Sequence, residues 1–233
     1  MTKIGIAHGL AAATLALALA ACGPKEAPKA APPPPPRPQI VIPPKPNPPS
    51  GAAREQPVPP VGADGLFKSV NREISPAQIT WNLRAAYNVG ALNCPNPARD
   101  EITTAYREFL RKHARGLTAA NRAVDSEWRA RYGASFVRER EKYMTEVYNH
   151  YALPPVMTEF CNAVLAMSRD SIAIKTTELA AFTSRSLPSI EIVYDDFFRR
   201  YAQYRTDLAA WEARYGVLVN ASPSTAIGQT LAY

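Results

Sequence analysis

Few side chains in this sequence of 233 residues are of the types and spacings that usually carry catalysis. The histidines His8, His113 and His150 form no Glu-x-x-His or His-Glu-x-x-His pattern, which would hold a metal ion on helices. No haem attachment motif, no Gly-x-Ser-x-Gly motif and no glycine-rich phosphate loop occurs. We expect His113 and His150 at the surface or at helix ends. The sequence therefore predicts no catalytic residue, no cofactor and no metal site.

The adjacent carboxylates Asp195 and Asp196 are the most obvious acidic pair. A pair of carboxylates could cleave glycosidic bonds. Neighbouring acids near a helix start are more often solvated or stabilised by the helix dipole, which is the interpretation we favour. An envelope enzyme that acts on peptidoglycan through an unidentified catalytic carboxylate stays an alternative.

The first 21 residues have the composition of an export signal. Lys3 supplies a positive charge, and Leu10–Ala21 is almost pure Leu and Ala but too short for a transmembrane helix of about 20 residues. The stretch ends in Leu19-Ala20-Ala21-Cys22, which resembles the lipobox of bacterial lipoproteins at every position. The resemblance implies cleavage before Cys22, lipid on this cysteine and anchoring to a membrane. The alternative is an ordinary signal peptide with an incidental cysteine.

Gly23 follows the cysteine, where an aspartate would favour retention in the inner membrane. By analogy with bacterial lipoproteins we expect anchoring to the outer membrane with the domain facing the periplasm. The inner membrane and the cell surface are alternatives.

Cys94 and Cys161 remain after the expected cleavage. An even number of cysteines in an oxidising compartment favours a disulfide, which would close a loop of 66 intervening residues. In the chain-entropy model such a bridge contributes about 4 kcal/mol to stability. The alternative is two buried thiols that pack as small apolar groups.

The prolines divide the mature chain, because 16 of the 23 lie between residues 23 and 60. Proline-rich segments favour polyproline II at about 3.1 Å per residue and cannot build a packed core. We therefore expect a disordered linker over 22–60, which serves either as a tether or as a recognition strip for an aromatic groove. A transition over 61–74 then leads to a helical domain over 75–216 and an irregular tail over 217–233.

Capping residues and prolines predict an all-α bundle of about six helices in this domain. Ser75-Pro76-Ala77-Gln78 is typical of a helix start, and Pro95 should end that helix. Asn96-Pro97 repeats the start signal. Breaks are expected at two glycines and a proline pair, namely Gly116, Gly133 and Pro154-Pro155. Pro188 should open a last helix that ends near Gly216.

That last helix carries an apolar stripe at alternating intervals of three and four residues: Tyr194, Phe197, Tyr201, Tyr204, Leu208, Trp211 and Tyr215. Such a stripe is typical of a face that packs into a core. Residues Trp128–Gly133 match Trp211–Gly216 at five of six positions. The echo is either a shared helix ending or a duplicated helical hairpin.

The charge is modestly basic, with a formal net value of +7. The region 107–142 holds ten Lys or Arg and five Asp or Glu, and Arg107, Arg111 and Arg115 are spaced for one helical face. Such a face could meet anionic groups of the envelope, but a solvated face with local pairs, such as Glu108 with Arg111, is the interpretation we favour. We expect no nucleic-acid partner.

The run Trp81–Cys94 resembles a segment found in uncharacterised alphaproteobacterial envelope proteins, for which no activity is implied. Together these observations predict a membrane-anchored envelope lipoprotein with a non-enzymatic helical interaction or scaffold module. Its expected partners are the membrane, through the lipid, and an envelope protein or peptidoglycan. The alternatives are a peptidoglycan-acting enzyme and a bundle that binds a small ligand.

Overall fold

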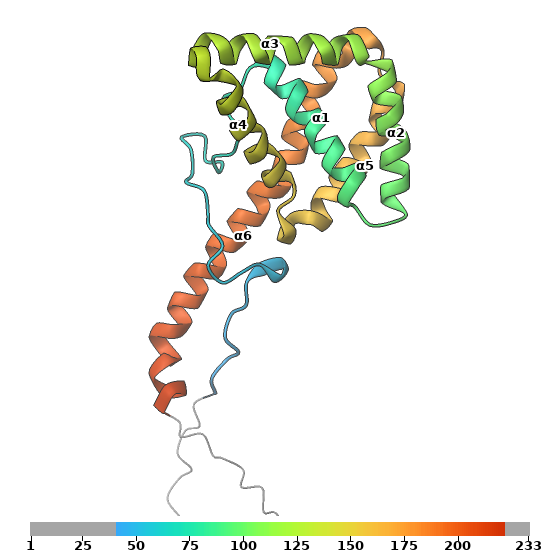
Figure 1. The fold of residues 1–233 in the computed structure, drawn as a ribbon. Helices are drawn as coiled ribbons and strands as arrows, with labels where there is room; N and C mark the ends of the chain where they lie inside the picture. Colours follow the sequence, from blue (N-terminus) through green and yellow to red (C-terminus); the bar gives the residue numbers. More distant parts are fainter. Residues whose placement is uncertain (1–40, 222–233) are drawn as a thin grey trace, which may run out of the picture. The chain divides into compact units, whose positions relative to one another are not determined.

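The computed structural model describes residues 41–221, which form an all-α fold (Figure 1). Within this range six α-helices follow one another: α1 (Pro76–Asn93), α2 (Ala98–Lys112), α3 (Ala114–Tyr132), α4 (Phe136–Tyr151), α5 (Met157–Ala173) and α6 (Leu179–Ala221). Short 3-10 turns lie at Pro49–Gly51, Gly133–Ser135, Pro154–Val156 and Thr176–Glu178. The predicted helical-bundle class is confirmed. The expected signal peptide, Cys22 and residues 222–233 lie outside the described residues.

The start of α1 is fixed by the capping box that the sequence predicts. The backbone N–H of Gln78 donates to Ser75 Oγ at 3.1 Å, and the backbone N–H of Ser75 donates to Gln78 Oε1 at 3.1 Å. Pro76 occupies the first helical position, where its missing N–H costs nothing. The helix ends at Asn93 because Pro95 cannot continue it.

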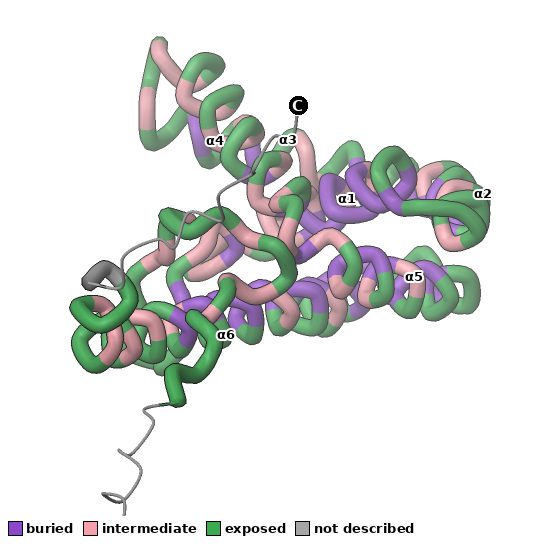
Figure 2. Tube along the Cα trace, turned by 90° about the horizontal axis from the view of Figure 1, so that it is seen from below, coloured by how far each residue is buried: buried purple, intermediate pink, exposed green. Residues whose placement is uncertain are grey.

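Helix α1 is the centre of the bundle and contacts all five other α-helices. Figure 2 shows α1 largely buried, whereas α4 is mostly exposed or intermediate. Small residues allow this close packing, and Gly90 shows it best. A Cβ atom at that position would lie 2.7 Å from Val164 Cγ1 on α5. Buried rings of Tyr87, Phe109 and Phe182 fill the space around α1.

The two predicted glycine breaks have different outcomes. Gly133 does end α3, with a positive φ of 55° that glycine adopts at no steric cost. The break expected at Gly116 is wrong, because the chain turns at His113 and Gly116 lies inside α3. A Cβ at Gly116 would approach Leu179 Cδ2 to 2.6 Å, so this glycine serves a close helix contact rather than a turn.

The boundaries predicted for the last helix are also wrong. Helix α6 begins at Leu179, runs through Pro188 and continues past Gly216 to Ala221. Proline removes one helical hydrogen bond, to the carbonyl of Ser184, but Phe182, Leu187 and Ile190 are buried on both sides of it. Their packing holds the helix together across the gap. Residues 217–221 of the expected irregular tail are therefore helical.

Residues 42–74 lie along α6 in the opposite direction, and we call this segment the strap (Figure 1). Successive strap residues contact α6 at positions progressively closer to the N-terminus of α6. The Trp211 Nε1–H donates to the Pro43 carbonyl at 2.8 Å, the Tyr201 hydroxyl donates to the Arg54 carbonyl at 2.6 Å, and the Phe67 N–H donates to Asp195 at 2.8 Å.

The strap differs from the disordered linker and transition that we expected up to residue 74. Proline leaves carbonyl oxygens free to accept hydrogen bonds from side chains of a neighbouring helix, and Pro43 does so. The earlier part of the expected linker, residues 22–40, lies outside the described residues.

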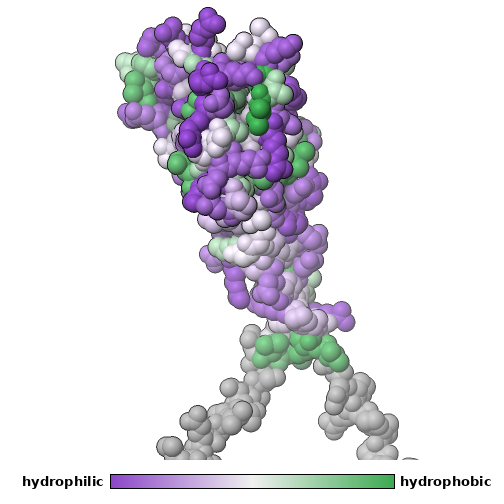
Figure 3. All heavy atoms as spheres, turned by 90° about the vertical axis from the view of Figure 1, so that its right-hand side faces the viewer, coloured by the Kyte–Doolittle hydropathy of each residue, from purple (hydrophilic) through white to green (hydrophobic). Residues whose placement is uncertain are grey.

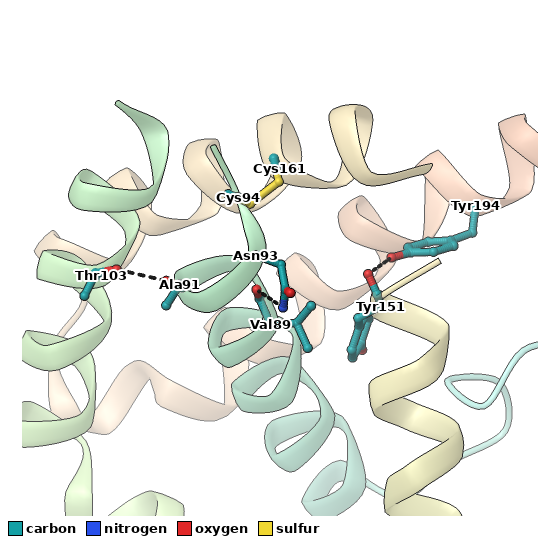
Figure 4. Close-up of a disulfide and its surroundings, with 8 residues drawn as sticks. All are labelled: Val89, Ala91, Asn93, Cys94, Thr103, Tyr151, Cys161 and Tyr194. Atoms are coloured by element: carbon teal, nitrogen blue, oxygen red, sulfur yellow. Dashed lines mark hydrogen bonds between the residues drawn. A yellow bond between two sulfur atoms is a disulfide. The ribbon is translucent and has the colours of Figure 1, made fainter. Parts of the chain in front are cut away.

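The predicted disulfide between Cys94 and Cys161 is present and joins the end of α1 to α5 (Figure 4). Its Cα atoms are 5.6 Å apart, within the usual range for a disulfide. Around it, the Thr103 hydroxyl donates to the Ala91 carbonyl at 3.2 Å and the Asn93 amide donates to the Val89 carbonyl at 3.0 Å. These bonds satisfy carbonyls near the end of α1.

Candidate functional site

A buried carboxylate, Glu191 on α6, is the centre of the most extensive polar network in the described residues. The Ser69 hydroxyl donates to Glu191 Oε2 at 2.7 Å, and the Asn71 amide donates to Oε1 at 2.7 Å. His150 Nε2, from the end of α4, lies 3.0 Å from the same Oε1 atom. The network therefore joins the strap, α4 and α6 at one point.

The network continues from the strap into the centre of the bundle. The Asn82 amide on α1 donates to Asn71 Oδ1 at 2.8 Å and to the Tyr143 hydroxyl at 2.5 Å. Asn82 is fully buried, so each of these bonds replaces one that water would have made. Its own Oδ1 has no hydrogen-bond partner in the structure. The strap is thereby connected to α1 as well as to α6.

One helical turn along α6, Asp195 fixes the strap a second time. Its carboxylate accepts from the Phe67 N–H at 2.8 Å and forms an ion pair with Arg72 at 2.5 Å. We expected both acids near a helix start, solvated or stabilised by the helix dipole, but α6 begins at Leu179 and both lie well inside it. Asp195 is buried, whereas Asp196 is exposed to solvent as expected. Consecutive residues of a helix point in different directions, so Asp195 faces the strap while Asp196 faces solvent.

The surroundings of Glu191 favour its ionised form. Burial raises the pKa of Glu191, but hydrogen bonding and the charge of His150, together with the Ser69 and Asn71 bonds, outweigh it and leave the pKa below its usual range. Burial and the nearby Glu191 charge raise the pKa of Tyr194 well above its ordinary value. A general acid needs a raised pKa, so Glu191 is poorly suited to donate a proton.

A groove with a volume of about 790 Å³ lies next to this network, between the strap and the α3–α4 hairpin. We call it the strap groove. Trp128, Tyr132 and Tyr143 provide aromatic walls, and the Trp128 and Tyr132 rings stack at 4.9 Å. Charged residues of both signs complete its lining: Lys68, Arg72, Glu73, Arg131, Glu139, Lys142 and Glu146. His150 lines the groove and touches Glu191.

The histidines are at helix ends, as predicted, but His113 is buried and His150 is only partly exposed. His150 lies in the last turn of α4, stacked on Tyr194 with 4.0 Å between ring centroids. His113 lies between α2 and α3, packed on Phe109, and neither of its ring nitrogens has a hydrogen-bond partner. Burial and the charge of Lys112 lower the pKa of His113, so its neutral form is favoured.

The basic face expected on one helix is divided between two. Arg111 lies in the last turn of α2 and pairs with Glu108 at 2.7 Å, as we expected, whereas Arg115 belongs to α3. A second hollow, of about 660 Å³, opens between α2 and α5. The Arg169–Glu101 ion pair, at 2.6 Å, stands at its edge.

Sequence reasoning located the disulfide but missed the network. Ser69, Asn71 and Glu191 are up to 122 residues apart in sequence and belong to no motif. One signal could have indicated it. Glu191 lies three residues before the stripe residue Tyr194, so the helical period places this acid on the inner face of α6. Cys22 lies outside the described residues. Among residues 41–221 no group of three His, Cys, Asp or Glu side chains is arranged to hold a metal ion.

No helix in the described part of the chain is long and apolar enough to cross a membrane. Comparison of the chain with protein-family models, with curated proteins and with solved structures gave no match.

Proposed function

We propose that this protein is a lipid-anchored envelope lipoprotein whose helical domain binds another envelope protein in the strap groove. The groove is the observation that carries the proposal. It combines stacked aromatic rings, charges of both signs and a floor held rigid by the buried Glu191 network. A few residues provide most of the binding energy in protein interfaces, and Trp, Tyr and Arg are enriched among them. A preorganised surface also loses little entropy on binding.

The same geometry favours binding over catalysis. The carboxylate of Glu191 accepts hydrogen bonds from two strap side chains, contacts His150 and lies behind the strap. A buried carboxylate with a lowered pKa stabilises its surroundings rather than transferring protons to a substrate. The two alternatives to this proposal are an enzyme that acts on peptidoglycan and a helical bundle that binds a small ligand.

The test is photocrosslinking of the intact lipoprotein in the envelope. A photoreactive phenylalanine at Lys142, which is exposed and lines the groove, is compared with one at Asn162, which is exposed on α5. We expect a single recurrent envelope protein attached at position 142 and not at 162. Glycan fragments at position 142 would support the enzyme instead, and equal adducts at both positions would contradict the groove.

Lipid attachment is tested separately with an alkynyl fatty acid fed to cells. The parent chain should be labelled, and Cys22→Ser should abolish the label. A matched Cys94→Ser variant should keep it, because that thiol is bonded to Cys161. Unchanged labelling of Cys22→Ser would overturn the lipoprotein proposal.

A further inference from the structure

The far end of α6 carries aliphatic side chains that the described chain leaves exposed. Val217 is 78% exposed and Val219 is 44% exposed. The strap begins near this end, because Pro43 and Lys45 contact Trp211 and Glu212, and Ile42 is 38% exposed. Figure 3 shows hydrophobic residues gathered at this end of the molecule, below a mostly hydrophilic surface. We call Ile42, Val217 and Val219 the α6 tip.

The residues directly above the tip have the composition of a membrane interface. Trp211 and Tyr215 are partly buried, with ring centroids 5.9 Å apart, and Arg214 lies 5.3 Å from the Tyr215 ring. Trp and Tyr rings prefer the headgroup level of a bilayer, and cationic side chains beside them meet anionic lipids. An apolar end followed by an aromatic and basic layer matches the polarity gradient from acyl chains to water.

Along the chain, the Ile42 side of the tip is the part of the domain that follows the expected lipid attachment site. Residues 23–41, which are 19 residues, separate Cys22 from Ile42. Even a fully extended chain of this length reaches only about 65 Å. The strap therefore enters the domain at the tip, within reach of the lipid expected on Cys22. The argument rests on the proposed lipid attachment.

We propose that the α6 tip inserts its aliphatic side chains into the lipid surface as a second, weak membrane contact. A second copy of the chain is a poorer occupant, since three aliphatic side chains provide far less than the roughly 1,200 Å² that a stable protein interface buries. A lipid surface has no such requirement, because each buried methylene contributes independently to binding. The contact would fix the orientation of α6 and hold the strap groove away from the membrane.

The test is spin labelling of the mature lipoprotein in vesicles of phosphatidylethanolamine and phosphatidylglycerol. Cys94 and Cys161 are bonded to each other and Cys22 is lipidated by the proposal, so an added cysteine is the reactive thiol. The label is placed by Val219→Cys. The matched control is Ile192→Cys, which is 58% exposed on the same helix and 27 positions away, or about 40 Å.

We expect the label at 219 to favour collisions with oxygen, which dissolves in lipid, several-fold over a water-soluble nickel complex. The label at 192 should show the opposite preference. Adding Val217→Asp should return the label at 219 toward the aqueous value, whereas Val137→Asp, at another exposed valine, should not.

Three other outcomes would overturn the proposal. An aqueous label at 219 would exclude insertion. Spectral broadening that disappears on dilution with unlabelled protein would show a second copy at the tip. Exclusion of both collision agents would show that the tip is covered by protein. Labelling of the parent chain, without an added cysteine, would instead expose a free Cys22 and contradict the lipoprotein proposal.

Discussion

The two halves of α6 carry the same aromatic spacing but contact very different partners. From Leu179 to Tyr201 the helix is packed inside the bundle, and Phe197 and Tyr201 are fully buried. Farther along, Trp211 and Tyr215 are partly exposed, and Trp211 contacts the strap at Pro43. A stripe at intervals of three and four residues therefore identifies a face that will be covered, but not what covers it.

The difference also shows in the kind of bond each half makes with the strap. The inner half holds the strap through Glu191 and Asp195, both buried and hydrogen-bonded. The outer half holds it through the exposed Lys45–Glu212 pair and the Trp211–Pro43 bond. Buried charge-assisted bonds are costly to break, whereas exposed pairs contribute little. We expect the strap to open from its outer end first.

The largest effect on this comparison should come from the disulfide, because it stabilises the bundle that encloses the inner half of α6. Replacing both Cys94 and Cys161 with Ser should lower the free energy of unfolding by about 4 kcal/mol. Urea unfolding measures this change. The unreduced and reduced parent chain are the controls, and reduction should reproduce the loss. An unchanged midpoint would show that helix packing alone fixes α1 against α5.

Removing the carboxylate of Glu191 should have the next largest effect. Glu191→Ala leaves Ser69, Asn71 and His150 without their buried acceptor and should cost about 2–4 kcal/mol. Glu191→Gln, which keeps the shape and one acceptor oxygen, should cost less. Equal losses for the two variants would mean that the side chain acts by packing rather than by accepting hydrogen bonds.

The same residue gives a pH dependence. The pKa of Glu191 is lowered in the folded protein, so its stabilising contribution is complete above the ordinary pKa of a glutamate. The contribution is lost as the pH falls below that value toward the folded pKa. Unfolding free energies of the parent chain should fall faster than those of Glu191→Gln in acid. Parallel curves for the two chains would contradict this.

Two glycine substitutions sharpen the comparison between the packed bundle and the outer half of α6. Gly90→Ala puts a Cβ 2.7 Å from Val164 Cγ1 and should destabilise the protein by about 1–3 kcal/mol, because the β-branched Val164 side chain is stiff. At Gly216 no atom lies within 4 Å of the Cβ, and Gly216→Ala should stabilise the helix by up to about 1 kcal/mol. Thermal unfolding of both variants gives the signs, and a shared sign would contradict the difference in packing.

Local signals in the sequence predicted most helix boundaries, whereas tertiary packing decided the rest. The capping box at Ser75 and the prolines at 95 and 154 act through their own backbone, so their effects could be predicted. Gly116 and Pro188 looked like breaks because their local preference opposes a helix. In the structure, contacts with distant side chains outweigh that preference.

The candidate site was harder to predict for the same reason. Cys94 and Cys161 could be paired by counting cysteines. Glu191 and its strap partners Ser69 and Asn71 meet only because the strap runs antiparallel to α6. The sequence of the strap, rich in proline and without an apolar period, gave no sign of that path. The matching runs Trp128–Gly133 and Trp211–Gly216 also differ in structure. Gly133 ends α3, whereas Gly216 lies within α6, so the same local sequence does not fix a helix end.

The smallest expected effect is at the outer end of the strap. Trp211→Phe removes the indole N–H that donates to the Pro43 carbonyl at 2.8 Å but keeps an aromatic ring beside Lys45. The cost should be about 0.5 kcal/mol, too little to move global unfolding clearly. Hydrogen exchange in a peptide covering residues 45–56, in which the Ala52 and Gln56 amides donate to the Pro49 carbonyl and the Tyr201 hydroxyl, should nevertheless accelerate, since opening there is local. Trp81→Phe, on α1, is the control and should leave this peptide unchanged. If Trp211→Phe accelerated exchange equally around Ser69 and Asn71, the strap would open as one unit and its two ends would not differ in stability.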